Sequence, residues 1–322
     1  MRTLDYSIRI GGEAGQGIQT IGGTLARVFA RTGYHVFTHQ DYESRIRGGH
    51  NFYQVRLSEE PVMSSREKID IVVALDKESI VRYKDERAEK GFIIYDSSTL
   101  KQKFDEPGFL DIPFDNLGVE HGGNKIMANT VAVGAVLGML GMKLEVLHDI
   151  FRETFRKKGE KIITGNINAA NAGHEYAAEK CRGCAFKVIG DDDSSRKGLM
   201  LIAGNDAIGL GAVASGVKFY SAYPMTPSTG IMNYIAGKEE EYGIIVEQAE
   251  DEIAAINMAL GASFAGVRAM TGTSGGGFAL MVEGLSLAGI TETPLVIALA
   301  QRPGPATGLP TKTEQGDLQF AI

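Results

Sequence analysis

The sequence has few cysteines, no long apolar run and no block of basic residues, and each absence excludes a class of protein. Two cysteines in 322 residues, Cys181 and Cys184, are too few for a secreted disulfide scaffold or for a zinc or iron–sulfur site of their own. No apolar stretch approaches the roughly 18 uninterrupted residues of a membrane-spanning helix. The opening "MRTLDYSIRIGG" lacks the basic and apolar regions of a signal peptide. A net charge of −7 argues against nucleic acid or an anionic membrane as a partner. We therefore predict a cytoplasmic protein.

Glycine, in contrast, is abundant, with 41 residues, and a hydrophobic content of 43% is ample for buried cores. The length predicts about two domains. In the first half, strand-like and helix-like segments alternate, which predicts a largely parallel sheet covered by helices. Strands are predicted over residues 6–12, 34–41, 51–58, 69–76 and 91–98, and helices over 17–33, 124–142 and 144–158.

A second alternation follows a stretch of serine, glycine and aspartate that has the composition of a linker. We predict a first domain over 1–185, a linker over 186–198 and a second domain over 199–322. The fold class is thus α/β, with two domains of largely parallel sheet. Because Ile322 lies in a segment with no predicted strand or helix, we expect the chain to end before its second domain does. Strands are predicted over 199–204, 218–224, 244–248, 267–273 and 294–301, with helices over 205–216, 227–243, 249–266 and 274–289.

The glycine-rich loop "GGEAGQG" lies between the first strand and the first helix. Such a loop can bring backbone N–H groups and a helix N-terminus to a phosphate. Its spacing, GxxGxG through Gly12, Gly15 and Gly17, differs from the dinucleotide fingerprint GxGxxG, although Asp41 follows at a distance that suits a ribose contact. The alternative is a tight turn without a ligand.

The segment "DYESRIRGGHNFYQVRLS" combines arginine side chains with a flexible backbone at Arg45, Arg47, Gly48 and Gly49. Guanidinium groups bind phosphates and carboxylates with two hydrogen bonds. The alternative is a turn whose arginines lie in solvent.

In "VKFYSAYPMTPSTGIM" two prolines, Pro224 and Pro227, fix the backbone around Thr226 where a strand should end. Ligands of open α/β sheets gather at the carboxyl ends of strands, so the Thr226 hydroxyl is a candidate ligand contact. The alternative is that Thr226 caps the following helix.

Four acids crowd the next strand–helix junction, "EQAEDE". Acids in the first turn of a helix are favoured by the helix dipole, which accounts for some of them. Glu250 precedes Ile253 and Ile256, so we expect it near the buried face, where a carboxylate has a perturbed pKa and a functional role.

Two further strand ends carry candidate groups. Ser274 opens "SGGGFALM", which is either an N-cap with close helix–sheet packing or another loop that faces a ligand. Arg302 leaves its strand just before Pro303, at the same predicted edge as Thr226 and Glu250, where an arginine suits an anionic substrate.

Taken in order, these motifs resemble the 2-oxoacid:ferredoxin oxidoreductases. The segments "YPMTPST", "EQAEDEIAAINMALGAS", "TGTSGGGFALMVEGL" and "AQRPGPATGLPT" are similar to the α subunit of that family. The segment from "GGEAGQG" to "NFYQVRLS", together with "NINAANAG", is similar to its γ domain. The resemblance covers nearly the whole chain, in the order of a γ–α fusion of the type that acts on 2-oxoglutarate.

The resemblance implies thiamine-diphosphate-dependent oxidative decarboxylation of a 2-oxoacid, with acyl transfer to coenzyme A and reduction of ferredoxin. By its place in "EQAE", Glu250 is implied to hydrogen-bond the aminopyrimidine ring of the cofactor and favour the tautomer that removes the thiazolium proton. Thr226 and Arg302 are implied to face the substrate. Tyr223, Pro224 and Ser274 are implied to lie against the cofactor, and Gly15, Gln16, Gly17, Arg47, Gly48 and Gly49 to lie at or near the coenzyme A site.

No segment matches a diphosphate and Mg²⁺ motif or a set of cluster cysteines, which in the family belong to the β subunit. The resemblance therefore implies a β-subunit partner that supplies Mg²⁺ and a 4Fe–4S cluster, with no turnover by this chain alone. Two other hypotheses stay open on the sequence: a nucleotide-dependent dehydrogenase that uses "GGEAGQG", and a subunit that acts only in assembly.

Overall fold

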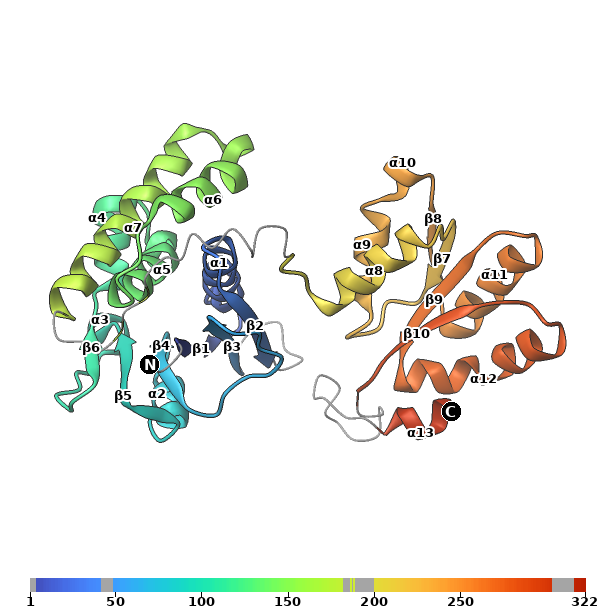
Figure 1. Ribbon diagram of the computed structural model, residues 1–322, viewed down its shortest axis with the longest axis horizontal. Helices are drawn as coiled ribbons and strands as arrows, with labels where there is room; N and C mark the ends of the chain where they lie inside the picture. The colour runs from blue at the N-terminus through green and yellow to red at the C-terminus, as the bar shows by residue number, and fades with distance from the viewer. Residues whose placement is uncertain (1–3, 42–48, 182–185, 187, 189–199, 303–315) are drawn as a thin grey trace. The chain divides into compact units, whose positions relative to one another are not determined.

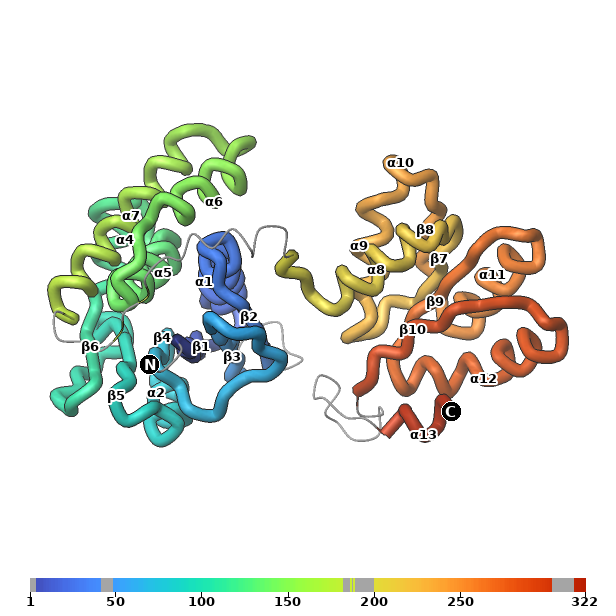
Figure 2. The backbone as a smooth tube through the Cα atoms, viewed as in Figure 1, coloured from blue at the N-terminus to red at the C-terminus, as the bar shows by residue number. Residues whose placement is uncertain are grey.

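The computed structural model describes residues 4–41, 49–181, 186, 188, 200–302 and 316–322. The chain divides into two compact units, Met1–Leu201 and Ile202–Ile322, which are called unit 1 and unit 2 below (Figures 1 and 2). The division lies between Leu201 and Ile202, whereas the sequence predicts a linker over 186–198. Phe186 and Val188, which the sequence places in that linker, are buried against unit 1, where the Val188 N–H donates to the Leu140 carbonyl over 3.0 Å.

Unit 1 is built on a six-stranded mixed sheet in the order β2-β3-β1-β4-β5-β6. Strands β1, β4, β5 and β6 run parallel, whereas β3 is antiparallel to both β1 and β2. Each strand predicted from the sequence in this half is present. The bounds are β1 Asp5–Glu13, β2 His35–Asp41, β3 His50–Ser58, β4 Ile69–Ala74, β5 Arg87–Tyr95 and β6 Phe109–Asp111.

Helices cover both faces of this sheet, because alternate strand residues are apolar on each side. One core joins β1 and β3 to α1, α5 and α6, and a smaller core lies under α2 on the opposite face. Helices α5 and α7 approach each other at backbone level: a Cβ on Gly134 or Gly138 would collide with a carbonyl of α7. The bounds are α1 Ile18–Arg31, α2 Lys77–Tyr83, α3 Ser97–Leu100, α4 Phe114–Gly122, η1 Lys125–Met127, α5 Ala128–Met139, α6 Glu145–Phe155, η2 Arg156–Lys158 and α7 Glu160–Lys180.

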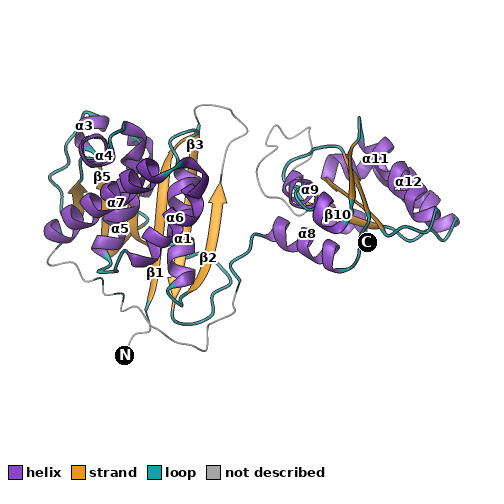
Figure 3. Cartoon of the chain, turned by 90° about the horizontal axis from the view of Figure 1, so that it is seen from above, coloured by secondary structure: helices purple, strands orange, loops and turns teal. Residues whose placement is uncertain are grey.

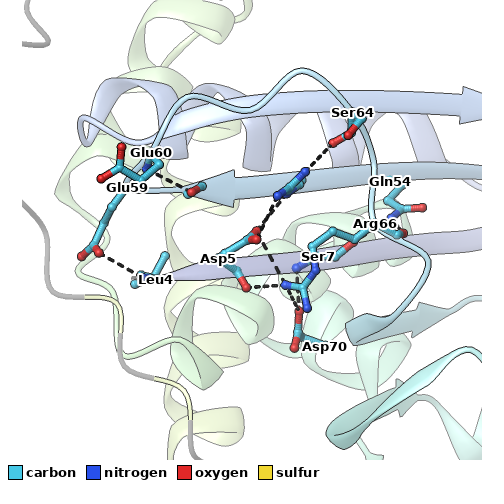
Figure 4. Close-up of polar contacts among 11 residues, drawn as sticks. Leu4, Asp5, Ser7, Gln54, Glu59, Glu60, Ser64, Arg66 and Asp70 are labelled. Atoms are coloured by element: carbon cyan, nitrogen blue, oxygen red, sulfur yellow. Dashed lines mark hydrogen bonds and ion pairs between the residues drawn. The ribbon is translucent and has the colours of Figure 1, made fainter. Parts of the chain in front are cut away.

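A polar network ties the start of β1 to its neighbours (Figure 4). Arg56 donates to both carboxylate oxygens of Asp5, at 2.9 Å each. Asp70 accepts a hydrogen bond from the Ser7 N–H at 2.8 Å, and Arg66 bridges Asp5 and Asp70. Burial raises the pKa of the Asp70 carboxyl, while Asp5 raises the pKa of Arg56 through their hydrogen bonds.

Two isosteric substitutions should distinguish the contributions of Asp5 and Asp70 to the free energy of unfolding. Asp5→Asn removes half of a two-point, charge-assisted pair and is expected to lower the free energy of unfolding by about 1.5–3 kcal/mol. Asp70→Asn keeps an acceptor for Ser7 and should cost less than about 1 kcal/mol. The midpoint of urea unfolding of the full chain, with hydrogen exchange of β1 as the local readout, measures both.

The Asp70 effect should also depend on pH. Since the pKa of this carboxyl is higher in the folded than in the unfolded state, its stabilising contribution is complete below the unfolded pKa of about 3.9 and is lost as the pH rises through the folded pKa. The cost of Asp70→Asn should therefore shrink as the pH rises from 3.5 to 6 (about two pH units above the unfolded pKa). A cost that grows over that range would contradict this account.

Unit 2 is a four-stranded, fully parallel sheet in the order β10-β9-β7-β8. Helices α8 and α9 pack on one face, and α11 and α12 on the other (Figure 3). The bounds are β7 Phe219–Ala222, β8 Ile245–Gln248, β9 Ala269–Ser274, β10 Val296–Ala300, α8 Gly204–Ala214, α9 Thr229–Ala236, α10 Glu239–Tyr242, α11 Glu252–Phe264, α12 Gly275–Ile290 and α13 Asp317–Ala321.

Two predictions for unit 2 are wrong. The strand predicted over 199–204 is absent from the described residues of that segment: 200–203 pair with no strand, and Met200 is 68% exposed. An apolar run forms a strand only when a neighbour supplies hydrogen bonds, and this run has none in the described residues. In the closing segment, where no helix was predicted, α13 forms against α12.

Candidate functional site

The carboxyl edge of the unit 2 sheet gathers the residues that the sequence singled out. Because all four strands are parallel, their carboxyl ends lie at one edge. Thr226 follows the end of β7, Glu250 follows β8, Ser274 is the last residue of β9, and Arg302 follows β10. The prediction that Thr226, Glu250 and Arg302 share this edge is confirmed.

The turn after β7 holds Thr226 without using it as a cap. Helix α9 begins at Thr229 with Ser228 as its N-cap, and no side chain donates or accepts a capping hydrogen bond. The buried Ser228 hydroxyl donates back to the Met225 carbonyl at 2.8 Å, and Asn205 donates to the Pro227 carbonyl at 2.9 Å. The turn is therefore fixed by other groups. The half-buried Thr226 hydroxyl has no hydrogen bond within the described part of the chain and remains available for a ligand.

The acidic junction after β8 differs from the sequence-based expectation. Glu250 is exposed rather than near the buried face. Asp251 is the N-cap of α11 and accepts from the Ala254 N–H at 2.7 Å. Glu252, the first helical residue, is only 4% exposed, and its Oε1 has no hydrogen-bond partner among the residues that the structure describes.

The prediction for this junction counts Ile253 as part of the buried face, but Ile253 is 50% exposed. The buried face of α11 runs through Ile256 and Leu260. Glu252 lies four residues before Ile256 and so belongs to that face, since residues four apart stack on one side of a helix. The spacing of Glu252 to Ile256 and Leu260 was the signal that identifies it.

The surroundings of Glu252 are polar but incompletely paired. Its Cγ and Oε1 lie 2.7 and 2.8 Å from the position that a Cβ on Gly277 would take, so the carboxylate rests on the first turn of α12. Ser274, the fully buried N-cap of α12, makes no capping hydrogen bond, and its Oγ has no partner in the described ranges. A buried carboxylate oxygen left without a donor costs about 1–3 kcal/mol or more. The edge is thus prepared for a ligand that donates a hydrogen bond.

In unit 1, the glycine loop also lies at the carboxyl edge of a sheet. Gly15 and Gly17 have φ angles of 94° and 84°, which only glycine adopts without strain. No side chain caps the N-terminus of α1, and Gln16 turns back to accept from the Glu13 N–H at 2.7 Å. The backbone N–H groups of the first turn of α1 are therefore not used by a side-chain cap.

Two hollows flank this loop. One, of about 350 Å³, is lined by Gly15, Gln16, Asp96, Lys125 and Asn129 among others. The second, of about 390 Å³, lies on the other side of the loop and includes Gly17 and Asp41. Gly49 precedes β3, whereas Arg45, Arg47 and Gly48 lie outside the described residues.

The first hollow is lined by side chains of both negative and positive charge. Lys125, 72% exposed on its side chain, pairs with Asp115 at 2.8 Å, and this pair raises the pKa of the lysine. Asp115 also accepts from the Thr99 hydroxyl at 2.8 Å, and its own N–H donates to the buried Asp96 at 3.1 Å. The acids are thus held in place while the lysine ammonium reaches solvent at the rim.

Within the described ranges, no group of three or more His, Cys, Asp or Glu side chains could hold a metal ion. Over the same part of the chain, no helix is both long and apolar enough to cross a membrane.

Comparison with known proteins matches both halves of the chain to one family. Residues 7–176 match the family model described as pyruvate ferredoxin/flavodoxin oxidoreductase. Residues 210–322 match the model of the thiamine-diphosphate-binding domain of pyruvate flavodoxin/ferredoxin oxidoreductase. The chain belongs to the 2-oxoacid:ferredoxin oxidoreductase family.

Relatives and a solved structure agree with this assignment. A 2-oxoacid:ferredoxin oxidoreductase α subunit from Sulfolobus is 31% identical over 97% of this chain and 57% of its own length. A 2-oxoglutarate synthase subunit from Archaeoglobus fulgidus is 50% identical, over 38% of this chain and 35% of its own length. The structure of 2-oxoglutarate:ferredoxin oxidoreductase from Magnetococcus marinus, with 2-oxoglutarate, coenzyme A and succinyl-CoA bound, aligns with a TM-score of 0.91 and 37% identity over all of this chain and 56% of that chain. The chain thus spans a little over half the length of its full-coverage relatives.

Proposed function

We propose that this chain is the γ–α part of a 2-oxoacid:ferredoxin oxidoreductase that converts a 2-oxoacid, with 2-oxoglutarate favoured, to the acyl-CoA. The observation that carries the proposal is the buried, incompletely paired carboxylate of Glu252, at the carboxyl edge of a domain that matches a thiamine-diphosphate-binding model. The membership of both halves in one oxidoreductase family disfavours the dehydrogenase and the assembly subunit.

The residues present fit the aminopyrimidine part of thiamine diphosphate. When bound, this cofactor supplies the nucleophilic carbon and the electron sink for decarboxylation. Glu252 would hold the ring through a hydrogen bond between its free Oε1 and a ring nitrogen, and its burial excludes competing water. We favour Glu252 over the sequence-predicted Glu250 because Glu250 is exposed. Tyr223, Pro224 and Ser274, at the ends of β7 and β9, would line the same site.

The substrate would be bound by Thr226 and Arg302, the two residues that the sequence predicts to face it. The Arg302 guanidinium would bind the carboxylate of the 2-oxoacid with charge-assisted hydrogen bonds. The hydroxyl of Thr226, on its fixed turn, would donate to the carboxylate or to the carbonyl oxygen. Support comes from their position, since both follow strands whose carboxyl ends share the edge with Glu252.

Coenzyme A would bind at the glycine loop of unit 1. The N–H groups at the start of α1, which no described side chain caps, suit a phosphate, and the exposed Lys125 ammonium, paired with Asp115 at the rim of the neighbouring hollow, is a further hydrogen-bond donor. The loop residues Gly15, Gln16 and Gly17 would contact the ligand, with Arg47, Gly48 and Gly49 beside them. The Magnetococcus relative supports the ligand class, because its structure contains coenzyme A and succinyl-CoA.

A β subunit would complete the enzyme by supplying the diphosphate and Mg²⁺ site and a 4Fe–4S cluster, from which electrons pass to ferredoxin. Helix α12 supports a protein partner, because its outer surface is apolar along its length: Leu280, Leu285, Leu287 and Ile290 are 40–81% exposed. The scarcity of cysteine, two in 322 residues, supports a cytoplasmic setting for this complex.

The test is reconstitution. Co-expression of the chain with a family β subunit should give coenzyme-A-dependent reduction of a viologen dye, faster with 2-oxoglutarate than with pyruvate. A stable complex that reduces no dye with any 2-oxoacid, although it contains the cofactor and cluster, would overturn the proposal. Activity with pyruvate alone would correct the substrate.

The coenzyme A site makes a separate prediction. Gly17→Ala forces a strained φ angle and brings a Cβ into the side chain of Asn129, so it should displace the loop from the start of α1. We expect the KM for coenzyme A in the reconstituted enzyme to rise about 10- to 100-fold, the range for losing hydrogen bonds to a charged group. The KM for the 2-oxoacid should change little. Gly23→Ala, on the same helix with open space around it, is the matched control. Equal effects of both variants would remove the loop from the coenzyme A site.

A further inference from the structure

Helix α13 returns the chain to the carboxyl edge of unit 2 and lies beside the start of α12 (Figure 1). Two contacts place it there. The ring of Phe320 meets the ring of Phe278 edge to face, with centroids 5.6 Å apart. The carboxylate of Asp317 lies so close to Gly275 that a Cβ on this glycine would collide with both of its oxygens.

Within the described part of the chain, no side chain caps the end of α12 that Asp317 contacts. The N-cap residue Ser274 makes no side-chain capping bond, and its buried hydroxyl has no hydrogen-bond partner among the described residues. A helix of 16 residues concentrates about half a positive charge at its N-terminus, where the first N–H groups have no partner within the helix. Such an end attracts carboxylates and phosphates.

The second carboxylate at this end is Glu252, which rests on Gly277, two residues further along α12. Both side chains are held partly out of water: Glu252 is buried, and the Oδ2 of Asp317 is inaccessible and has no hydrogen-bond partner within residues 200–302 and 316–322. The partial positive charge at the start of α12 attracts negatively charged groups placed there. The two glycines, by lacking Cβ atoms, allow both carboxylates to reach it.

We propose that Asp317 acts as an internal anion that occupies the N-terminus of α12, so that this end is closed to small oxyanions from solution. The assignment rests on the geometry of unit 2 alone. Its consequence rests on the proposed function: the carboxylate of a 2-oxoacid is repelled from the α12 side of the site and is directed to the side of Thr226 and Arg302. Asp317 is in this sense a positioning residue and makes no contact with the reacting atoms.

The test uses the full chain with inorganic phosphate as the probe and requires neither cofactor nor turnover. In Asp317→Ala, the amides of Gly275–Gly277 should exchange hydrogen about three- to tenfold faster than in the wild type, as expected for loss of one charge at a helix end. Added phosphate should restore slow exchange in this variant and leave the wild type unchanged. Glu283→Gln, on an exposed position of the same helix, makes the same change in charge and should behave as the wild type.

A second variant keeps Asp317 in the sequence but fills the space that its carboxylate occupies. Gly275→Ala should displace Asp317 and produce the same gain of phosphate sensitivity, whereas Gly289→Ala, with open space around it on α12, should not. Exchange in α11 reports whether each variant is folded. Phosphate protection of the wild type equal to that of Asp317→Ala, or no protection in either displaced variant, overturns the proposal without bearing on the oxidoreductase activity.

Discussion

Glu252→Gln is expected to lower the turnover of the reconstituted enzyme by about 10²–10⁴-fold, the range for losing a group that assists proton transfer. The amide has nearly the shape of the carboxylate, so the substitution should preserve the packing of α11 against α12. It removes the negative charge that favours a proton-bearing ring nitrogen, and it can present an N–H where the ring needs an acceptor. Steady-state dye reduction measures the loss. Circular dichroism of the variant shows whether the fold is intact.

The matched comparison is Glu250→Gln, two residues earlier in the same acidic junction. The family resemblance implies the catalytic role for Glu250, whereas burial, and an Oε1 that no described residue pairs with, favour Glu252. If Glu250→Gln abolishes turnover and Glu252→Gln does not, the sequence-based assignment is correct, and a partner subunit must cover Glu250 in the complex. If both variants remain active, neither carboxylate holds the cofactor ring.

Arg302→Ala should raise the KM for the 2-oxoacid by about 10- to 150-fold, which corresponds to the roughly 1.5–3 kcal/mol of hydrogen bonds between charged groups. In the proposed role the guanidinium would bind the substrate carboxylate in the ground state and in the transition state alike, so kcat should fall much less than kcat/KM. Arg302→Lys keeps the charge but loses the two-point geometry and should give an intermediate KM.

The control for this variant is Arg268→Ala. Arg268 precedes β9 and donates to the Ser215 carbonyl, at the amino edge of the same sheet. Removing it changes the net charge equally but leaves the carboxyl edge intact. A KM that rises equally in both variants would show a general effect of charge. A drop in kcat without any change in KM for Arg302→Ala would place the arginine at the reacting centre instead.

The order of strands and helices from β7 to β10 could be predicted because apolar periodicity is a local property. The β7 and β9 strands, for example, are bounded by glycine and proline and enclosed by helices of matching period. Their parallel arrangement follows from the crossover helices, and with it the common edge of Thr226 and Arg302. This part of the site needed no information about contacts.

Burial at the start of α11 could not be settled in the same way. Whether Glu250 or Glu252 faces inward depends on where the helix begins, and Asp251 fixes that point by capping the Ala254 N–H. Four neighbouring acids give the sequence several equivalent starting points. The close contacts of Asp317 with Gly275 and of Glu252 with Gly277 likewise could not be predicted, because a glycine in a sequence does not indicate which side chain approaches it.

The close contact between α5 and α7 has a consequence for the distant glycine loop. Gly134 and Gly138 on α5, and Gly173 on α7, leave peptide groups in contact where side chains usually intervene. Asn129, at the start of α5, lies against Gly17. Backbone atoms thus set the distance between α5 and α7. This distance fixes the position of Asn129 against Gly17 of the loop. Substitution of neighbouring side chains in unit 1 therefore cannot easily change the distance between α5 and α7. The backbone of this helix pair thus helps to determine the shape of the glycine loop.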